Sequence, residues 1–218
     1  MKRVILKIIP ALICGVVLTG CGGKEDDPET SSITSISVTV ENGSAFASKI
    51  EDVMALLTDE NAMVKTVKYG NGVFTIDLPA TVNESYLKNV DGGYPALKIS
   101  NKKVKGVSIN IDAFQSGVCV GNFYHAKNSG IQTEALFVYV DGDVKITGSD
   151  SFTIINRDPY GSLLGEHTYN TTYNVSLKKG WNIIYFTETH SGPGFKTSTT
   201  ETITTNVPDG MKWYFRNV

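Results

Sequence analysis

The feature that most limits how this chain can fold is an alternation of apolar and polar residues with period two. The stretch "SISVTV" places Ile36, Val38 and Val40 on one face and serine or threonine on the other. Successive side chains of a strand point to opposite faces, so the alternation is typical of half-buried β-strands. The sequence therefore predicts an all-β fold, an antiparallel β-sandwich formed as one elongated domain or as two small sandwich modules.

Three segments have the pattern of β-hairpins. They are residues 64–78 around Gly70-Asn71-Gly72, residues 135–148 around Asp141-Gly142, and residues 173–188 around a lysine-glycine turn. Glycine and asparagine tolerate the positive φ that tight hairpin turns require. Each segment is predicted to form two neighbouring strands.

Residues 49–58 fit two patterns. Ile50, Val53, Met54 and Leu57 have the spacing of an amphipathic helix, whereas Val53, Ala55 and Leu57 have that of a strand. Because strands are predicted on both sides, the strand is favoured, and the helix stays open as the alternative.

The chain begins with the pattern of a secretory signal. Lys2, Arg3 and Lys7 precede an apolar stretch over residues 8–18. A transmembrane helix needs about 20 apolar residues, so this stretch is too short to span a bilayer. Residues 1–20 are predicted to be a signal peptide.

The signal pattern ends in Leu18-Thr19-Gly20-Cys21. This motif resembles the lipobox of bacterial lipoproteins, in which the cysteine becomes the lipidated N-terminus of the mature chain. The resemblance implies a diacylglyceryl group on Cys21 and an acyl chain such as palmitate on its amine. Two or more chains hold a protein stably on a membrane, so the implied partner is the membrane itself.

Residues 21–32 contain glycine, lysine and a dense run of acids, with little to bury, and are predicted to be a disordered acidic tether. A lysine followed by acids behind the cysteine resembles the export signal of Bacteroidota surface lipoproteins. The resemblance implies an outer-membrane protein exposed at the cell surface.

A glycine- and proline-containing stretch, "NVDGGYPAL", is predicted to separate two regions. Residues 33–100 resemble, by pattern, the Ig-like or transthyretin-like sandwich modules of Bacteroidota surface proteins. Residues 101–218 are predicted to be a second, β-rich module.

Charge and residue types exclude several functions. The formal net charge is −2 and the chain has no basic run that could follow phosphates, so no nucleic-acid partner is predicted. His125, His167 and His190 are not spaced as metal ligands, and no metal or cofactor is predicted. The aspartates of Asp141-Gly142-Asp143 are interpreted as turn residues in preference to calcium ligands.

Catalytic motifs are equally scarce. No Gly-x-Ser-x-Gly elbow occurs, and no enzymatic activity is predicted. Cys119, between two valines, is expected to be a small buried residue.

Aromatic residues are abundant in the second half of the chain. Trp181 and Trp213 are assigned to the core, whereas Tyr160 and Phe195, in loops, are predicted to be exposed and to bind ligand. The function predicted is therefore non-enzymatic binding of a glycan, peptide or surface-protein partner, accessory to uptake or adhesion. The alternatives are a structural subunit of a surface appendage, marked by a long unpaired edge strand, and a small hydrolase, marked by clustered carboxylates or histidines.

Overall fold

The computed structural model describes residues 32–90, 96–129, 131–158, 160, 162–192 and 194–217. The predicted signal peptide and the lipobox with Cys21 lie outside the described residues. The fold is all-β, with two short 3-10 helices, η1 (Gly43–Phe46) and η2 (Glu84–Tyr86). The strands are β1 (Ser35–Thr39), β2 (Asp52–Leu57), β3 (Met63–Lys68), β4 (Val73–Asp77), β5 (Lys88–Asn89), β6 (Lys98–Ile99), β7 (Lys105–Gln115), β8 (Val118–Ser129), β9 (Ile131–Val140), β10 (Val144–Arg157), β11 (Leu163–Leu177), β12 (Gly180–Ser191), β13 (Lys196–Thr204) and β14 (Lys212–Asn217).

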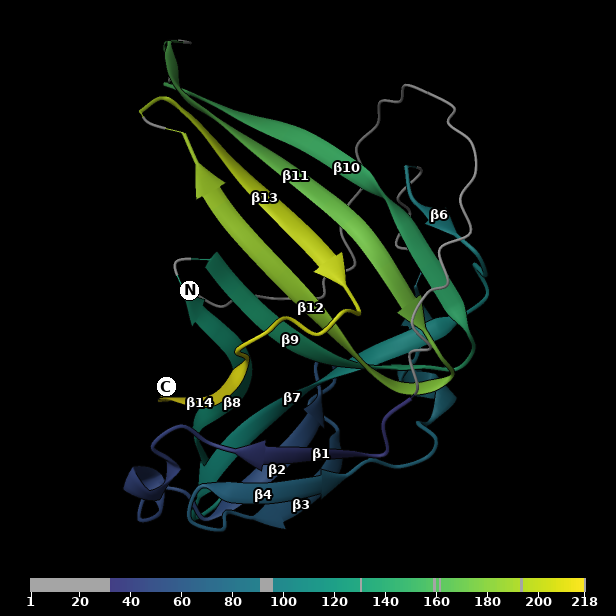
Figure 1. Ribbon diagram of the computed structural model, residues 1–218, viewed down its shortest axis with the longest axis vertical. Helices are drawn as coiled ribbons and strands as arrows, with labels where there is room; N and C mark the ends of the chain where they lie inside the picture. The colour runs from purple at the N-terminus through teal and green to yellow at the C-terminus, as the bar shows by residue number, and fades with distance from the viewer. Residues whose placement is uncertain are drawn as a thin grey trace.

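These strands form two sheets, which confirms the predicted sandwich (Figure 1). The small sheet is the pair β1-β4, and the large sheet has the order β3-β2-β7-β8-β9-β12-β13-β11-β10-β6, with β14 beside β8 and β5 beside β7. All ladders in the large sheet are antiparallel except that between β11 and β13. Between the two sheets lies the sandwich core, which includes Ile36, Val38, Phe74, Ile76, Val53, Ile109, Phe123, Phe137, Trp181 and Trp213.

A second core occupies the opposite face of the large sheet. This outer core consists of Val104, Val138, Val140, Val144, Val175, Leu177, Ile184 and Ile203. Strand β9 serves both cores because its residues alternate: Phe137 and Tyr139 enter the sandwich core, whereas Val138 and Val140 enter the outer core. A strand buried on both faces is apolar in nearly every position.

Residues 49–58 contain strand β2, so the strand pattern prevailed over the helical one. Val53, Ala55 and Leu57 are buried in the sandwich core. β2 hydrogen-bonds to β3 on one side and to β7 on the other. Residues from both halves of the chain therefore meet in one sheet and one core.

The three predicted hairpins are wrong, although their strands are present. β3 pairs with β2 and β4 with β1, so the turn at Asn71 and Gly72, both with positive φ, carries the chain from one sheet to the other. Strands β9 and β10 are not neighbours, and β13 lies between β11 and β12. Turn residues reverse the chain, but pairing is decided by partners that are distant in sequence.

Both tryptophans lie in the sandwich core, as predicted, and both join distant parts of the chain. Trp181 is 2% exposed, forms an isolated bridge with Ile33, and donates a hydrogen bond from Nε1 to the Pro79 carbonyl at 2.9 Å. Trp213, near the end of the chain, bridges to Val40. The end of β1 is thus in contact with β14.

Cys119 lies in strand β8, but the prediction that it is buried is wrong, because the residue is exposed. It follows the Ser116-Gly117 turn, and the β7-β8 ladder shifts register at Ala113/Phe114 beside it. At this end of the hairpin the strand has left the core.

No helix in the described part of the chain is long and apolar enough to cross a membrane.

Candidate ligand-binding site

The candidate site lies where three strands of the large sheet separate. Strand β7 pairs with β9 over residues 106–109 and with β8 over residues 111–115. Strands β8 and β9 pair with each other only over residues 126–129 and 131–134. The three ladders therefore end around a triangular opening. Along its border the strands do not pair with one another.

A cavity of about 700 Å³ occupies this opening, a volume suited to a small-molecule ligand. Its floor is apolar because it consists of sandwich-core residues, among them Ile109, Ile111, Phe123, Phe137 and Trp213. Phe137 stacks on Trp213 with 5.7 Å between ring centroids and 8° between planes. Such buried, stacked rings give the floor a fixed shape.

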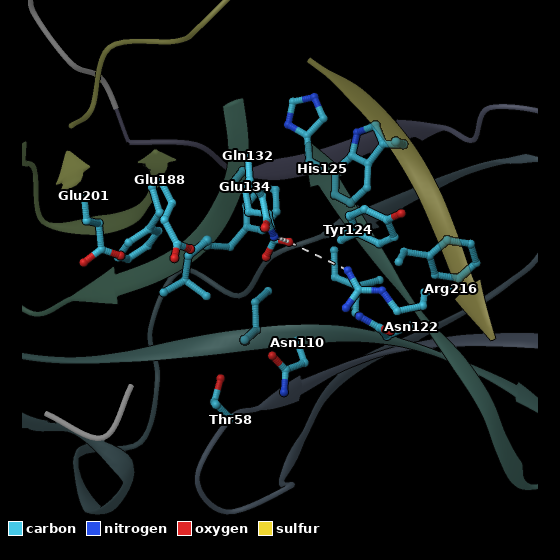
Figure 2. A pocket seen from close by; sticks show the side chains of 18 residues that line it. Thr58, Asn110, Asn122, Tyr124, His125, Gln132, Glu134, Glu188, Glu201 and Arg216 are labelled. Atoms are coloured by element: carbon cyan, nitrogen blue, oxygen red, sulfur yellow. Dashed lines mark hydrogen bonds and ion pairs between the residues drawn. The ribbon is translucent and has the colours of Figure 1, made fainter. Parts of the chain in front are cut away.

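The rim of the cavity is polar. It includes the amides of Asn110, Asn122 and Gln132, the carboxylates of Glu134, Glu188 and Glu201, the guanidinium of Arg216 and the ring of Tyr124. Figure 2 shows Glu188 and Glu201 together on one side, with Tyr124 and Arg216 on the other. The side chains come from β7, β8, β9, β12, β13 and β14, so they come together only when the sheet has formed.

The one guanidinium of the rim is already engaged. Arg216 lies 3.7 Å from a Glu134 oxygen, and its guanidinium carbon is 4.4 Å from the centroid of the Tyr124 ring. Glu134 also accepts a 2.7 Å hydrogen bond from Gln132. This arrangement orients Glu134 and Tyr124 and leaves the rim with more negative than positive charge.

Glu188 and Glu201 are directly opposite each other on β12 and β13. Like charges in directly opposed positions destabilise a sheet. Some of this repulsion is offset, because Thr171 donates a 3.4 Å hydrogen bond to Glu201 and His190 Nε2 lies 3.2 Å from Glu188. Two adjacent carboxylates are strong acceptors for a ligand that brings hydroxyl or ammonium donors.

Behind these carboxylates, Tyr173 of β11 lies between the cavity rim and the outer core. Its burial, together with the negative charges of Glu201 and Asp150, raises the pKa of its phenol to about 12. The phenol therefore stays protonated at neutral pH.

His125 lines the cavity from β8, at a half-buried position. Its ring stacks on Trp213 at 4.9 Å. Burial lowers its pKa, an effect that the backbone of Met211 opposes. Among the described residues, Nδ1 is buried and has no hydrogen-bond partner; a buried polar atom of this kind is often satisfied by water or ligand.

The residues predicted to bind ligand lie elsewhere. Tyr160 is 93% exposed and Phe195 is 70% exposed, as predicted. They occupy the β10-β11 and β12-β13 connections, which lie together at the far end of the large sheet (Figure 1), where the Phe195 carbonyl accepts from the Glu166 amide at 2.7 Å. Neither residue lines the cavity, and their role in binding stays a prediction.

His167 and His190, which are distant in sequence, meet at Thr199. The Thr199 hydroxyl is 2.9 Å from His167 Nε2 and 3.0 Å from His190 Nδ1. Within the described residues, no group of three His, Cys, Asp or Glu side chains is arranged to hold a metal ion. Both histidines are within hydrogen-bonding distance of the Thr199 hydroxyl in the sheet.

The aspartates around Gly142 have structural partners. Asp141 accepts a 2.8 Å hydrogen bond from the Lys105 amide, and Asp143 accepts one of the same length from the Lys179 amide. The latter bond and the Lys178 ammonium lower the pKa of Asp143. These carboxylates hold the β9-β10 connection against β7 and against the β11-β12 connection.

Comparison with protein-family models, with curated proteins and with solved structures gives no match.

The cavity is therefore the feature that bears on function, and it was not predicted from the sequence. A signal was present, because Glu134, Glu188 and Glu201 each interrupt an apolar or threonine-rich alternation. A charge in mid-strand on a partly buried face has a desolvation cost, which is typical of functional residues.

Proposed function

We propose that this protein is a lipid-anchored cell-surface binding protein whose cavity takes a neutral or amino-substituted oligosaccharide. The observation that carries the proposal is the combination of an apolar, aromatic floor with a rim of amides and carboxylates. Sugar rings have apolar faces that pack on such floors, and their hydroxyl groups both donate and accept hydrogen bonds. The rim offers acceptors in Glu188 and Glu201 and donors in its side-chain amides.

The charge of the rim supports this class of ligand over anionic ones. Three carboxylates face one guanidinium, which is held by Glu134. A phosphate or carboxylate ligand would meet Glu188 and Glu201 and be repelled. A basic peptide is the rival ligand. Salt separates it from a neutral sugar, because screening weakens binding of the charged peptide only, whereas an amino-substituted sugar is distinguished by its direct detection on a glycan array.

The test is a glycan array followed by calorimetric titration, using the unlipidated mature chain with Cys21→Ser. Glu188→Gln and Tyr124→Ala are expected to weaken binding about 10- to 100-fold, because each removes a polar or stacking contact. Glu60→Gln is the matched control, since Glu60 is an exposed carboxylate in the β2-β3 connection. The absence of any neutral or basic sugar ligand, or full binding by both rim variants, would overturn the proposal.

The proposed anchor is tested separately. Cys21→Ala is expected to abolish metabolic labelling with palmitate and to leave the signal peptide uncleaved. Normal lipid labelling of this variant would contradict the anchor while leaving the cavity proposal intact.

A further inference from the structure

Strand β10 exposes a long edge of the large sheet. It pairs with β11 along nearly its whole length, but on its other side β6 pairs only with Ile146 and Thr147. Among the described residues, no strand pairs with this side of residues 148–157. In Figure 1 this part of β10 borders the end of the sheet that extends beyond the sandwich.

The edge lacks the devices that usually prevent strand addition. Natural edge strands are protected by lysine, proline, or inward-pointing charges. The opposite edge of the large sheet follows this rule, since β3 has exposed Lys65 and Lys68. Residues 151–156 read "SFTIIN", with no charge and no proline.

The same segment exposes apolar side chains on both faces of the sheet. Phe152 is 48% exposed, Ile154 is 44% exposed and Ile155 is 50% exposed. Phe152 stacks on Tyr169 of β11 with centroids 4.8 Å apart, which fixes its ring above the edge. A rigid, apolar, uncharged edge strand is a template for another strand.

We propose that two copies of this protein pair through β10, antiparallel, to form one continuous sheet across a two-fold axis. Such an axis keeps both faces of the sheet continuous and makes the interface isologous. With Thr153 on the axis, Phe152 of each copy lies opposite Ile154 of the other, and aromatic and β-branched side chains make favourable cross-strand pairs.

Charge favours the same arrangement. Asp150 and Arg157 stand near opposite ends of the free edge. Antiparallel pairing about Thr153 places Asp150 opposite Asn156, and Arg157 opposite Ser149, of the other copy, so that no like charges are opposed. A parallel arrangement in register would instead bring like charges together. The edge thus complements a second copy of itself.

Sedimentation velocity of the unlipidated mature chain, across a hundredfold concentration range, tests the pairing. A monomer-dimer equilibrium is expected, and Ile154→Lys is expected to weaken it at least about tenfold, because charged edge residues oppose strand addition. Val118→Lys is the matched control, since Val118 is an exposed valine on β8. A protein that stays monomeric, or a dimer that survives Ile154→Lys, would overturn the proposal, as would capture of a foreign extended peptide by a monomer.

Disulfide trapping tests the register. In a Cys119→Ser background, Thr153→Cys is expected to form an intermolecular disulfide, because opposed Cβ atoms lie about 4.5–5.5 Å apart. Ser149→Cys is the control, since in this register the two copies of residue 149 lie eight positions apart, or about 26 Å. Equal crosslinking of both variants would refute the Thr153-centred pairing.

Discussion

Glu188 and Glu201 provide the sharpest test of the site, because their proposed role in binding opposes stability. Their opposed positions on β12 and β13 imply a separation of about 5 Å between side chains. Coulomb repulsion at that distance is about 0.8 kcal/mol in water and about 3 kcal/mol at an effective dielectric constant of 20. Both residues are partly exposed, so screening places the cost near the lower figure, at about 1 kcal/mol.

Glu188→Gln is therefore expected to increase the free energy of unfolding by about 1 kcal/mol and Tm by about 2–4 °C. Glu201→Gln should do the same, and the double variant should gain no more than either single one, because one substitution already removes the repulsion. Urea unfolding at low salt and about pH 8 keeps imidazolium charge out of the comparison. Additive gains in the double variant, or a loss of stability in either single one, would refute the reasoning.

Three further predictions concern the fold around the site. The pKa of Tyr173 in the folded protein is raised to about 12, so the phenol contributes fully to the free energy of unfolding below about pH 10 and this contribution is lost as pH rises towards 12. After discounting for partial exposure, the loss is about 1 kcal/mol. Tyr173→Phe should flatten that part of an alkaline unfolding profile. Cys119, being exposed, should react with a thiol reagent in the native protein at a rate close to that of the unfolded chain; strong protection would contradict its placement. A Cβ at Gly121 would collide with the Arg216 backbone oxygen and the Phe215 ring, so Gly121→Ala should displace β14 and cost about 1–3 kcal/mol, and a wild-type melting curve would argue against that packing.

The local pattern predicted the strands but not their neighbours. Alternation in "SISVTV" and in the segments around Asp141 and Gly180 identified β1, β9, β10, β11 and β12 correctly. The hairpin predicted around Gly180 failed because β13 inserts between β11 and β12, and the one around Asn71 failed because β3 and β4 belong to different sheets. No local signal marks either arrangement. Burial of Trp181 and Trp213 was predictable from their apolar surface, whereas exposure of Cys119 depended on where a hairpin leaves the core.

The cavity was the least predictable feature, for the same physical reason. Glu188 and Glu201 meet in the β12-β13 hairpin, but Glu134 joins them only through the long-range pairing of β9 with β12. Single-sequence reasoning can recognise each as a charge in a strand, but it cannot place them on one face. Tyr160 and Phe195 were easier to place because loop residues are exposed whatever the pairing.

The bridges from Ile33 to Trp181 and from Val40 to Trp213 have a consequence for how the chain acquires its structure. The residues on either side of β1 cannot complete their contacts until Trp213 has been synthesised. Folds dominated by contacts of such high sequence separation fold slowly, in milliseconds to seconds. For the secreted protein proposed above, this late closure of the sandwich would keep the polypeptide unfolded until it has passed through the export channel.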